Sequence, residues 1–238
     1  MVLPPRTDIY LDNTDPNCLI ITGTDLSADP DWFSGKNKVV VRCMSLTLPA
    51  EISWKNGNLL LVVGTLVCQS NGSSIIVDGK NGKGFGSASA ASGASPGANG
   101  GNGKNGSQGS DGGTINIVAS RIAGDLSLYA RGGNGGDAQS GGNGANGKNA
   151  VKPSCNNNKG AAAGKGGNAG KAGTPGNGGN GGSIELICGE IDGRPPILDV
   201  SSGQPGKSAQ HGKPGKGGSA AAGTTCYSHS FRLCMDTI

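Results

Sequence analysis

The stretch GAAAGKGGNAGKAGTPGNGGNGG, residues 160–182, decides the fold of this 238-residue chain. Glycine occupies every third residue through most of it, and these in-phase glycines are Gly164, Gly167, Gly170, Gly173, Gly176, Gly179 and Gly182. Three residues make one turn of a polyproline II helix, so the glycines would leave one edge of such a helix without side chains. Because a bare edge lets another backbone approach closely, the stretch predicts polyproline II helices that pack against one another.

The same period recurs in three other stretches, residues 97–112, 132–147 and 203–218, with Ala138 and Ala209 as single substitutes for glycine. A flexible linker has no need of a fixed phase, and collagen would place proline in many of the other positions. Asn, Ala, Lys and Ser fill them here. We therefore expect several polyproline II helices from one chain, side by side, with N–H···O=C bonds between their backbones.

The rest of the chain has the pattern of short strands. Apolar, β-branched runs are separated by Gly, Asn, Asp or Pro, and they lie at residues 18–21, 39–41, 46–48, 59–63, 66–67 and 75–77. Residues 114–119 and 183–188 start two similar copies, in which Ile115 matches Ile184 and Gly132 matches Gly203. The second of these offsets is larger by two, and Pro195 and Pro196 would mark the insertion. The bulky residues Trp32, Phe33 and Trp54 are expected to cap or fill the amino-terminal end.

These patterns predict an all-β, non-helical protein in which a β-solenoid-like base carries a projecting bundle of glycine-rich polyproline II helices. The expected parts are a β-rich region, 1–78, alternating β rungs and glycine-rich hairpins, 79–223, and a terminal β segment or cap, 224–238. The hairpins would pair residues 79–94 with 97–113 and residues 132–150 with 160–182. Cys18, Cys43 and Cys68 are evenly spaced along the chain, which fits rungs that stack equivalent positions.

The composition bounds the size of the core and the compartment. Glycine contributes 47 residues and aromatic residues only 3%, so a conventional core is small. Seven cysteines leave at least one without an intrachain partner, and Cys226 and Cys234 are close enough in sequence for a local disulfide. A protein with so little core gains from disulfides, which favours an extracellular, cell-surface or virion-surface location. The first residues contain no apolar signal region, and no stretch reaches transmembrane length, so we expect no membrane insertion.

Charge is unevenly distributed along the chain. The formal net charge is +4, but residues 79–113, 132–182 and 203–223 together hold eleven lysines and only two acidic residues. These lysines could simply keep a polar bundle soluble, or they could form a basic face for an anionic glycan or cell surface. Aromatic stacking residues are scarce in these runs, so nucleic acid is not an expected partner.

No catalytic or metal-binding motif accompanies the repeats. His211 and His229 lack a nucleophile at a recognisable spacing, and no Cys/His cluster indicates zinc. Acidic residues on the strands, among them Glu185, Glu190 and Asp192, leave a polysaccharide enzyme with a carboxylate cluster as an alternative. Scattered acidic residues at strand edges are the commoner explanation. We expect a non-enzymatic protein without a cofactor.

The in-phase glycine runs resemble two known groups of proteins. One is the snow-flea type of antifreeze protein, and the other is the glycine-rich tip adhesin of some tailed phages. The first resemblance implies a bundle of polyproline II helices with a flat ice-binding face, which Lys165 and Lys171 interrupt here. The second implies polyproline II layers that carry receptor-binding loops at their ends, although no tail-attachment module is recognisable.

Two functions follow as hypotheses. The first is a structural protein of an extracellular or virion-surface assembly, whose main partner is itself and which forms a fibre or lattice. The second is an adhesin that binds a receptor or glycan through its hairpin tips, and ice binding comes third. The turn 151–159 interrupts the period most, and it supplies amides and cations for such a site. Its candidate contact residues are Lys152, Cys155, Asn156, Asn157, Asn158 and Lys159.

Overall fold

The protein is an all-β protein, as its sequence predicts, and the structure shows that most of its paired strands are parallel. The computed structural model describes residues 7–10, 17–152 and 160–221. In these ranges the only helix is the 3-10 turn η1, Pro30–Phe33. The strands are β1 Thr7–Tyr10, β2 Cys18–Ser27, β3 Lys38–Thr47, β4 Glu51–Ser53, β5 Asn58–Val67, β6 Ser73–Ile76, β7 Thr114–Ala123, β8 Leu126–Tyr129, β9 Ser183–Asp192 and β10 Ile197–Asp199.

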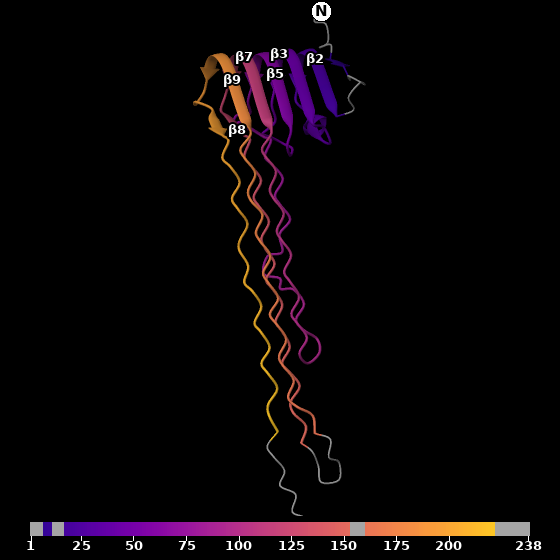
Figure 1. The fold of residues 1–238 in the computed structure, drawn as a ribbon. Coiled ribbons are helices and arrows are strands. Elements are labelled where there is room, and N and C mark those ends of the chain that lie inside the picture. The colour runs from indigo at the N-terminus through magenta and orange to yellow at the C-terminus, as the bar shows by residue number, and fades with distance from the viewer. Residues whose placement is uncertain (1–6, 11–16, 153–159, 222–238) are drawn as a thin grey trace, which may run out of the picture. The chain divides into compact units, whose positions relative to one another are not determined.

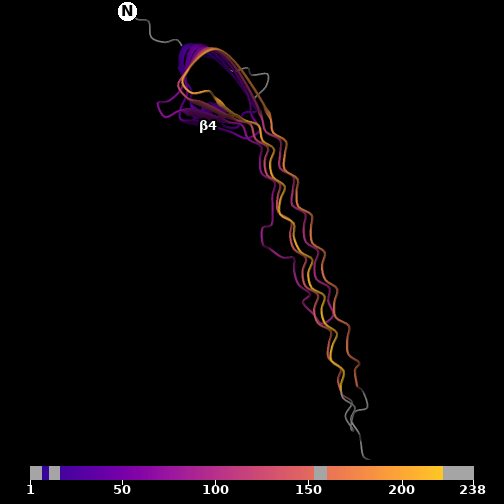
Figure 2. The same ribbon diagram turned by 90° about the vertical axis from the view of Figure 1, so that its left-hand side faces the viewer.

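The strands form two sheets. The larger has the order β1-β2-β3-β5-β7-β9, and its strands from β2 to β9 lie side by side in Figure 1. All neighbours in it are parallel except β1 and β2. The smaller sheet has the order β10-β8-β6-β4 and is also parallel. Figure 2, turned by 90°, shows it as a second layer that faces the larger sheet.

The pairing register reveals how the glycine runs are inserted. Cys18 pairs with Lys38, and Lys38 pairs with Asn58, so the first copies follow one another at short, equal intervals. Asn58 then pairs with Thr114, and Thr114 pairs with Ser183, so the later intervals are much longer. Strands β5, β7 and β9 have the same length, and only the connections between them are longer. The glycine-rich runs therefore lie in these connections, between one strand and its partner in the next copy.

Two expectations about this register are wrong. Cys18, Cys43 and Cys68 do not stack, because the strand that begins at Cys18 aligns Lys38 and Asn58 with it, and Cys43 lies opposite Gly23 and Val63. The strands of the two long copies pair Thr114 with Ser183 and Ser127 with Ile197. The sequence separation between partners is therefore only one residue larger in the second pair than in the first. The insertion between these pairs of strands is therefore a single residue, and not two.

The hydrophobic core lies between the two sheets, and its end at strand β2 is covered by other residues. Ile21 on β2 and Ile117 on β7 are fully buried, like most core-facing residues between them. Phe33 and Trp54 are also buried there, with ring centroids 4.7 Å apart. The expectation that these two aromatic residues fill the amino-terminal end is confirmed. Strand β1, which adds to β2 in the antiparallel direction, was not predictable from its short and polar sequence.

The chain divides into two compact units, each made of three stretches. The sheet unit comprises Met1–Ser87, Lys104–Gln139 and Gly173–Ala209. The glycine unit comprises Ala88–Gly103, Ser140–Ala172 and Gln210–Ile238. Apart from isolated bridges, the described glycine-rich residues of both units are neither helix nor strand, yet backbone hydrogen bonds join them throughout.

In the sheet unit these bonds follow the period of three. Gly132 N–H donates to Ser201 O at 2.9 Å, and Gly135 N–H donates to Gln204 O at 2.8 Å, so residues 132–135 run parallel to 201–204. In the antiparallel direction, the N–H groups of Gly176, Gly179 and Gly182 donate to the carbonyls of Gly136, Gly133 and Ala130. A middle segment is thus bonded on several sides at once.

The glycine unit repeats this scheme. Gly141, Gly144 and Gly147 donate to Gln210, Lys213 and Lys216, while Gly164, Gly167 and Gly170 donate back to Lys148, Ala145 and Gly142. Ala98 N–H donates to Ser95 O at 2.9 Å, within the turn that the sequence places near residues 95–96. Val151 and Ala161 form an antiparallel bridge.

Candidate functional site

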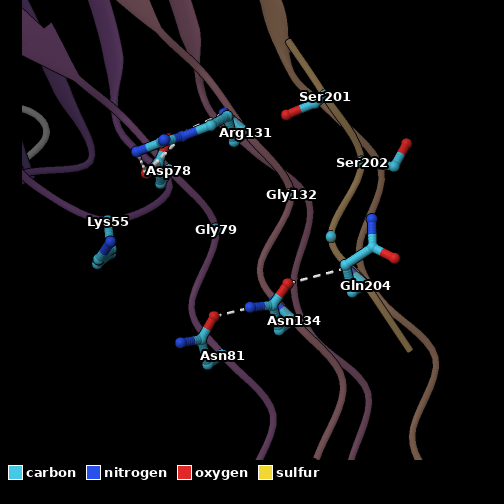
Figure 3. Close-up of a pocket in the computed structure, with 11 residues that line it drawn as sticks. Lys55, Asp78, Gly79, Asn81, Arg131, Gly132, Asn134, Ser201, Ser202 and Gln204 are labelled. Atoms are coloured by element: carbon cyan, nitrogen blue, oxygen red, sulfur yellow. Dashed lines mark hydrogen bonds and ion pairs between the residues drawn. The ribbon is translucent and has the colours of Figure 1, made fainter. Parts of the chain in front are cut away.

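A polar pocket of about 370 Å³ lies in the sheet unit, where the glycine-rich segments leave the smaller sheet (Figure 3). Three parallel segments build it, beginning at Asp78, Arg131 and Ser201. They lie in register because each carbonyl accepts the N–H of the preceding copy: Gly79 donates to Arg131, and Gly132 donates to Ser201. The lining residues are Lys55, Asp78, Gly79, Asn81, Arg131, Gly132, Asn134, Ser201, Ser202, Gly203 and Gln204.

Asp78 and Arg131 form the charged part of this pocket. The Arg131 Nη2 lies 2.7 Å from Asp78 Oδ2, and Nε lies 3.2 Å from both carboxylate oxygens. The Arg131 backbone N–H also donates to Asp78 Oδ1 at 2.9 Å, and the guanidinium lies 4.8 Å from the centre of the Tyr129 ring. Burial raises the pKa of Asp78, but the hydrogen bonds and charge of Arg131 outweigh it and leave that pKa below its usual value.

Asparagine side chains form the second feature of the pocket. Asn81 Oδ1 accepts the Asn134 backbone N–H at 2.9 Å, and Asn134 Oδ1 accepts that of Gln204 at 2.8 Å, in the row visible in Figure 3. Lys55 supplies an ammonium group close by. Both oxygens of Asp78 are occupied by Arg131, so this carboxylate is not placed to act as a base. The pocket offers hydroxyl, amide and cationic groups, which suit a polar ligand.

The second candidate site is the free edge of both sheets at their last strands, β9 and β10, which we call the open end. Ile191 on β9 is 41% exposed, whereas its partner Ile122 on β7 is fully buried. Leu198 on β10 is 51% exposed, whereas its partner Leu128 is fully buried. Residues that occupy core positions in the preceding copy are therefore accessible here, and no other described strand pairs with the outer edges of β9 and β10.

The structure places only part of the predicted contact site. Lys152 is exposed and follows the bridge between Val151 and Ala161. The other predicted contact residues lie outside the described residues, as do the cysteines of the proposed local disulfide. These are Cys155, Asn156, Asn157, Asn158 and Lys159, and Cys226 and Cys234.

The in-phase glycines of residues 164–182 lie against neighbouring backbones. A Cβ atom built at Gly167, Gly170 or Gly173 would clash with the carbonyl oxygen of Ala98, Gly101 or Lys104, and the same holds for Gly176, Gly179 and Gly182 with Ser107, Ser110 and Gly113. Gly164 is less confined, because the nearest atom to its Cβ would be Lys148 N at 3.1 Å. These glycines are therefore required for the close approach of neighbouring backbones.

The four described cysteines are free thiols: Cys18, Cys43, Cys68 and Cys188. Burial is the main reason that the pKa of Cys68 rises to about 11; the charge of Asp125 adds to it, and a hydrogen bond with Ser73 opposes it. A thiol with so high a pKa is protonated and unreactive at neutral pH. Disulfides therefore do not link the described strands, contrary to the general expectation that disulfides support the small core.

Sequence reasoning missed the role of the asparagines. Their place between the glycines indicates only polar filling, but Asn99, Asn102 and Asn105 accept the N–H groups of Asn168, Lys171 and Thr174, all at 2.8–2.9 Å. Each donor lies 69 residues after its acceptor. The signal is present in the sequence, since asparagine recurs at one position of the triplet, immediately before the in-phase glycine of residues 97–112.

Comparison with protein-family models, curated proteins and solved structures gave no significant match. Across the described residues, no group of three or more His, Cys, Asp or Glu side chains is arranged to hold a metal ion. The same residues contain no helix with the length and apolar character needed to cross a bilayer.

Proposed function

We propose that the protein is a non-enzymatic structural component of an extracellular or virion-surface assembly, and that two copies associate through the open end. The observation that carries this proposal is the exposure of core positions at the last strands, where Leu198 is 51% exposed and its partner Leu128 is fully buried. An unpaired strand edge with apolar side chains favours pairing with another chain.

The finer architecture belongs to the same proposal. We propose that the two sheets are faces of one β-solenoid and that the glycine-rich segments are polyproline II helices arranged as a bundle. The constant pairing of successive strands supports the first statement. Hydrogen bonds at every third residue support the second, because that is the repeat of a polyproline II helix.

The occupant of the open end is a second copy joined through the same end. A fibre needs two complementary ends, but the first strands are covered: β1 adds to β2, Phe33 and Trp54 fill the core, and Ile21 is fully buried. Among the described strands, only the last ones leave core positions accessible. Association of identical surfaces closes after two copies, so the pair replaces the fibre as the first step of assembly.

Charge on β9 does not oppose such a pair. An antiparallel overlap of two β9 strands that sets Leu186 opposite Cys188 keeps these two core-facing residues on the same side. It also sets Glu185 opposite Gly189 and Glu190 opposite Ile184. Carboxylates of the two copies therefore do not face one another, which avoids the repulsion between like charges on paired strands.

Sedimentation velocity over a range of concentrations tests this proposal. We expect wild-type protein to sediment with twice the mass of one chain, and Ile191→Lys to shift it to single chains, because an ammonium group at the interface would be desolvated. Val62→Lys is the matched control: Val62 is 40% exposed and Ile191 41%, but Val62 lies on the inner strand β5.

Leu198→Lys on β10 is a second variant, in case Ile191→Lys does not fold, and it should also give single chains. Circular dichroism checks the fold of each variant. The proposal is wrong if wild-type protein stays a single chain at the highest concentration. It is also wrong if the β9 or β10 variants fold and pair as strongly as the control.

A further inference from the structure

The described part of the glycine unit is purely cationic. It holds six lysines and no acidic residue, whereas the sheet unit contains both signs of charge. All six are exposed: Lys148, Lys152, Lys165, Lys171, Lys213 and Lys216. Charges of one sign attract counter-ions and anionic ligands more strongly when no acidic neighbour cancels them.

The hydrogen-bonded scheme determines where two of these lysines project. Asn143 Oδ1 accepts the Lys213 N–H at 2.7 Å, and Asn146 Oδ1 accepts the Lys216 N–H at 2.8 Å. On a middle segment, this position of the triplet therefore directs its side chain towards the next segment. Residues 210–221 lie beside residues 141–150 and are the last described segment in this row of parallel segments. Lys213 and Lys216 occupy the same triplet position as Asn143 and Asn146, so their side chains project from the outer edge of the row.

Antiparallel bonding brings two more lysines to the same edge. Gly212, Gly215 and Gly218 donate to Gly170, Gly167 and Gly164, all at 2.9 Å. Lys171 therefore lies near His211, and Lys165 lies beyond Lys216. The His211 Nδ1 accepts the Ala172 N–H at 3.0 Å, which fixes the imidazole between the two segments. Lys165 and Lys171 on one segment therefore lie along the same edge as Lys213 and Lys216 on the other, and backbone hydrogen bonds join the two segments.

We propose that this edge, formed by Lys165, Lys171, Lys213 and Lys216, binds a linear acidic polysaccharide. Lys213 and Lys216 lie one triplet apart, and one triplet of a polyproline II helix advances about 9 Å. The four cations are therefore spread along an extended edge, where they can contact successive charges of an extended anionic chain. Asn168 is exposed on the same segment as Lys165 and Lys171 and offers an amide to hydroxyl groups.

Nucleic acid fits this edge less well. The described residues of the glycine unit include no Phe, Tyr or Trp, so unpaired bases would find no ring on which to stack. The alternative explanation for lysines at this edge is that they prevent pairing with other chains, and it predicts no ligand. The proposal does not depend on the pairing of two copies, since these lysines belong to a different unit from β9 and β10.

Binding to immobilised heparin and to polygalacturonate, with uncharged dextran as the reference, tests the proposal on the full chain. Replacing all four edge lysines by glutamine should weaken binding to both polyanions by at least about tenfold, since each lysine near an anionic surface contributes measurably. The salt dependence of binding should fall as well. The matched control replaces Lys38, Lys80, Lys83 and Lys104, four exposed lysines of the sheet unit, by glutamine.

The control should retain binding to within a few-fold of wild type, although it loses the same net charge. Equal loss in both quadruple variants would overturn the proposal, because net charge alone would then explain binding. No binding to either polyanion near physiological ionic strength would overturn it too, and would leave edge protection as the role of the lysines. Tighter binding of a single-stranded oligonucleotide than of either polysaccharide would contradict the assignment of the ligand.

Discussion

At the scale of single residues, the number of glycines in a triplet reflects how many neighbouring segments pack closely against it. A Cβ at Gly132 would clash with Gly179 O, and a Cβ at the adjacent Gly133 would clash with Lys80 O. This part of the segment therefore needs glycine at two of three positions. Gly147 occupies the same triplet position as Gly132, but the residue after it is Lys148, so only one of the two glycine positions is kept there. A single glycine phase in the sequence predicts one packed edge and misses the second.

Replacement of an in-phase glycine should be costly for this reason. In Gly170→Val the new side chain would clash with Gly101 O, and Gly170 also donates its N–H to Gly142 O at 2.9 Å. We expect a loss of about 3 kcal/mol or more in the free energy of unfolding, as for severe overpacking of a core. Urea unfolding measures it. Asn168→Ala, at an exposed side chain on the same segment, should change stability little; equal small effects at both positions would favour a flexible linker.

The asparagine ladder predicts a smaller and position-dependent effect. Asn134→Ala removes the acceptor of the Gln204 N–H and should cost about 1 kcal/mol, the net value of one hydrogen bond. Asn177 is exposed on the segment 160–182, which has no described successor in its layer, so Asn177→Ala should be nearly neutral. Thermal unfolding of both variants compares them. A loss at Asn177 as large as that at Asn134 would show that the ladder is not what stabilises these segments.

At the scale of elements, the strands were largely predictable and their connections were not. Two copies of an apolar strand, at residues 114–119 and 183–188, indicated the repeat, and β7 and β9 do pair residue by residue. The runs near residues 39–41 and 46–48 belong to one ten-residue strand, β3. The even cysteine spacing misled because the cysteines occupy different positions of their strands: Cys18 begins β2, whereas Cys43 lies within β3.

The pocket could not be predicted from any local motif. Asp78 and Arg131 are 53 residues apart and meet only because two glycine-rich segments begin side by side. Lys55 comes from a third part of the chain. Neither residue type nor spacing distinguishes these side chains in the sequence from other charged residues. Their proximity follows from the register of β6 and β8, where Ile76 pairs with Tyr129.

The Asp78–Arg131 pair makes stability depend on pH in a defined direction. Because the pKa of Asp78 is lower in the folded protein than its unfolded value of about 3.9, the pair stabilises the fold above that value. This contribution should disappear as pH falls through the folded pKa. The Arg131 side chain is 41% exposed, so solvent screening keeps the effect at about 1 kcal/mol or less.

Chemical unfolding of wild type and Asp78→Asn at several pH values measures this contribution. Asparagine keeps an oxygen that can accept the Arg131 backbone N–H, so the variant removes the charge and little else. The two proteins should differ in stability at pH 6 and converge at acidic pH. A difference that stays constant down to about pH 2 would show that the carboxylate charge does not contribute.

At the scale of the whole molecule, composition and period were sufficient to predict an all-β, non-helical protein. The asymmetry of its ends was not predictable, because β9 and β7 have similar apolar patterns, yet Ile191 is 41% exposed and Ile122 is fully buried. Exposure depends on what covers a strand, and a sequence pattern carries no such information. A fibre stays a prediction, and it would need a second open end besides the one at β9 and β10.

Electron microscopy of the purified protein at high concentration tests association through the open end. We predict discrete pairs in which two copies meet at their last strands, and we expect Ile191→Lys to give single particles while Val62→Lys does not. Long filaments would contradict the covered first strands, because growth needs a second open end. A uniform field of single particles from wild-type protein would contradict association through β9 and β10.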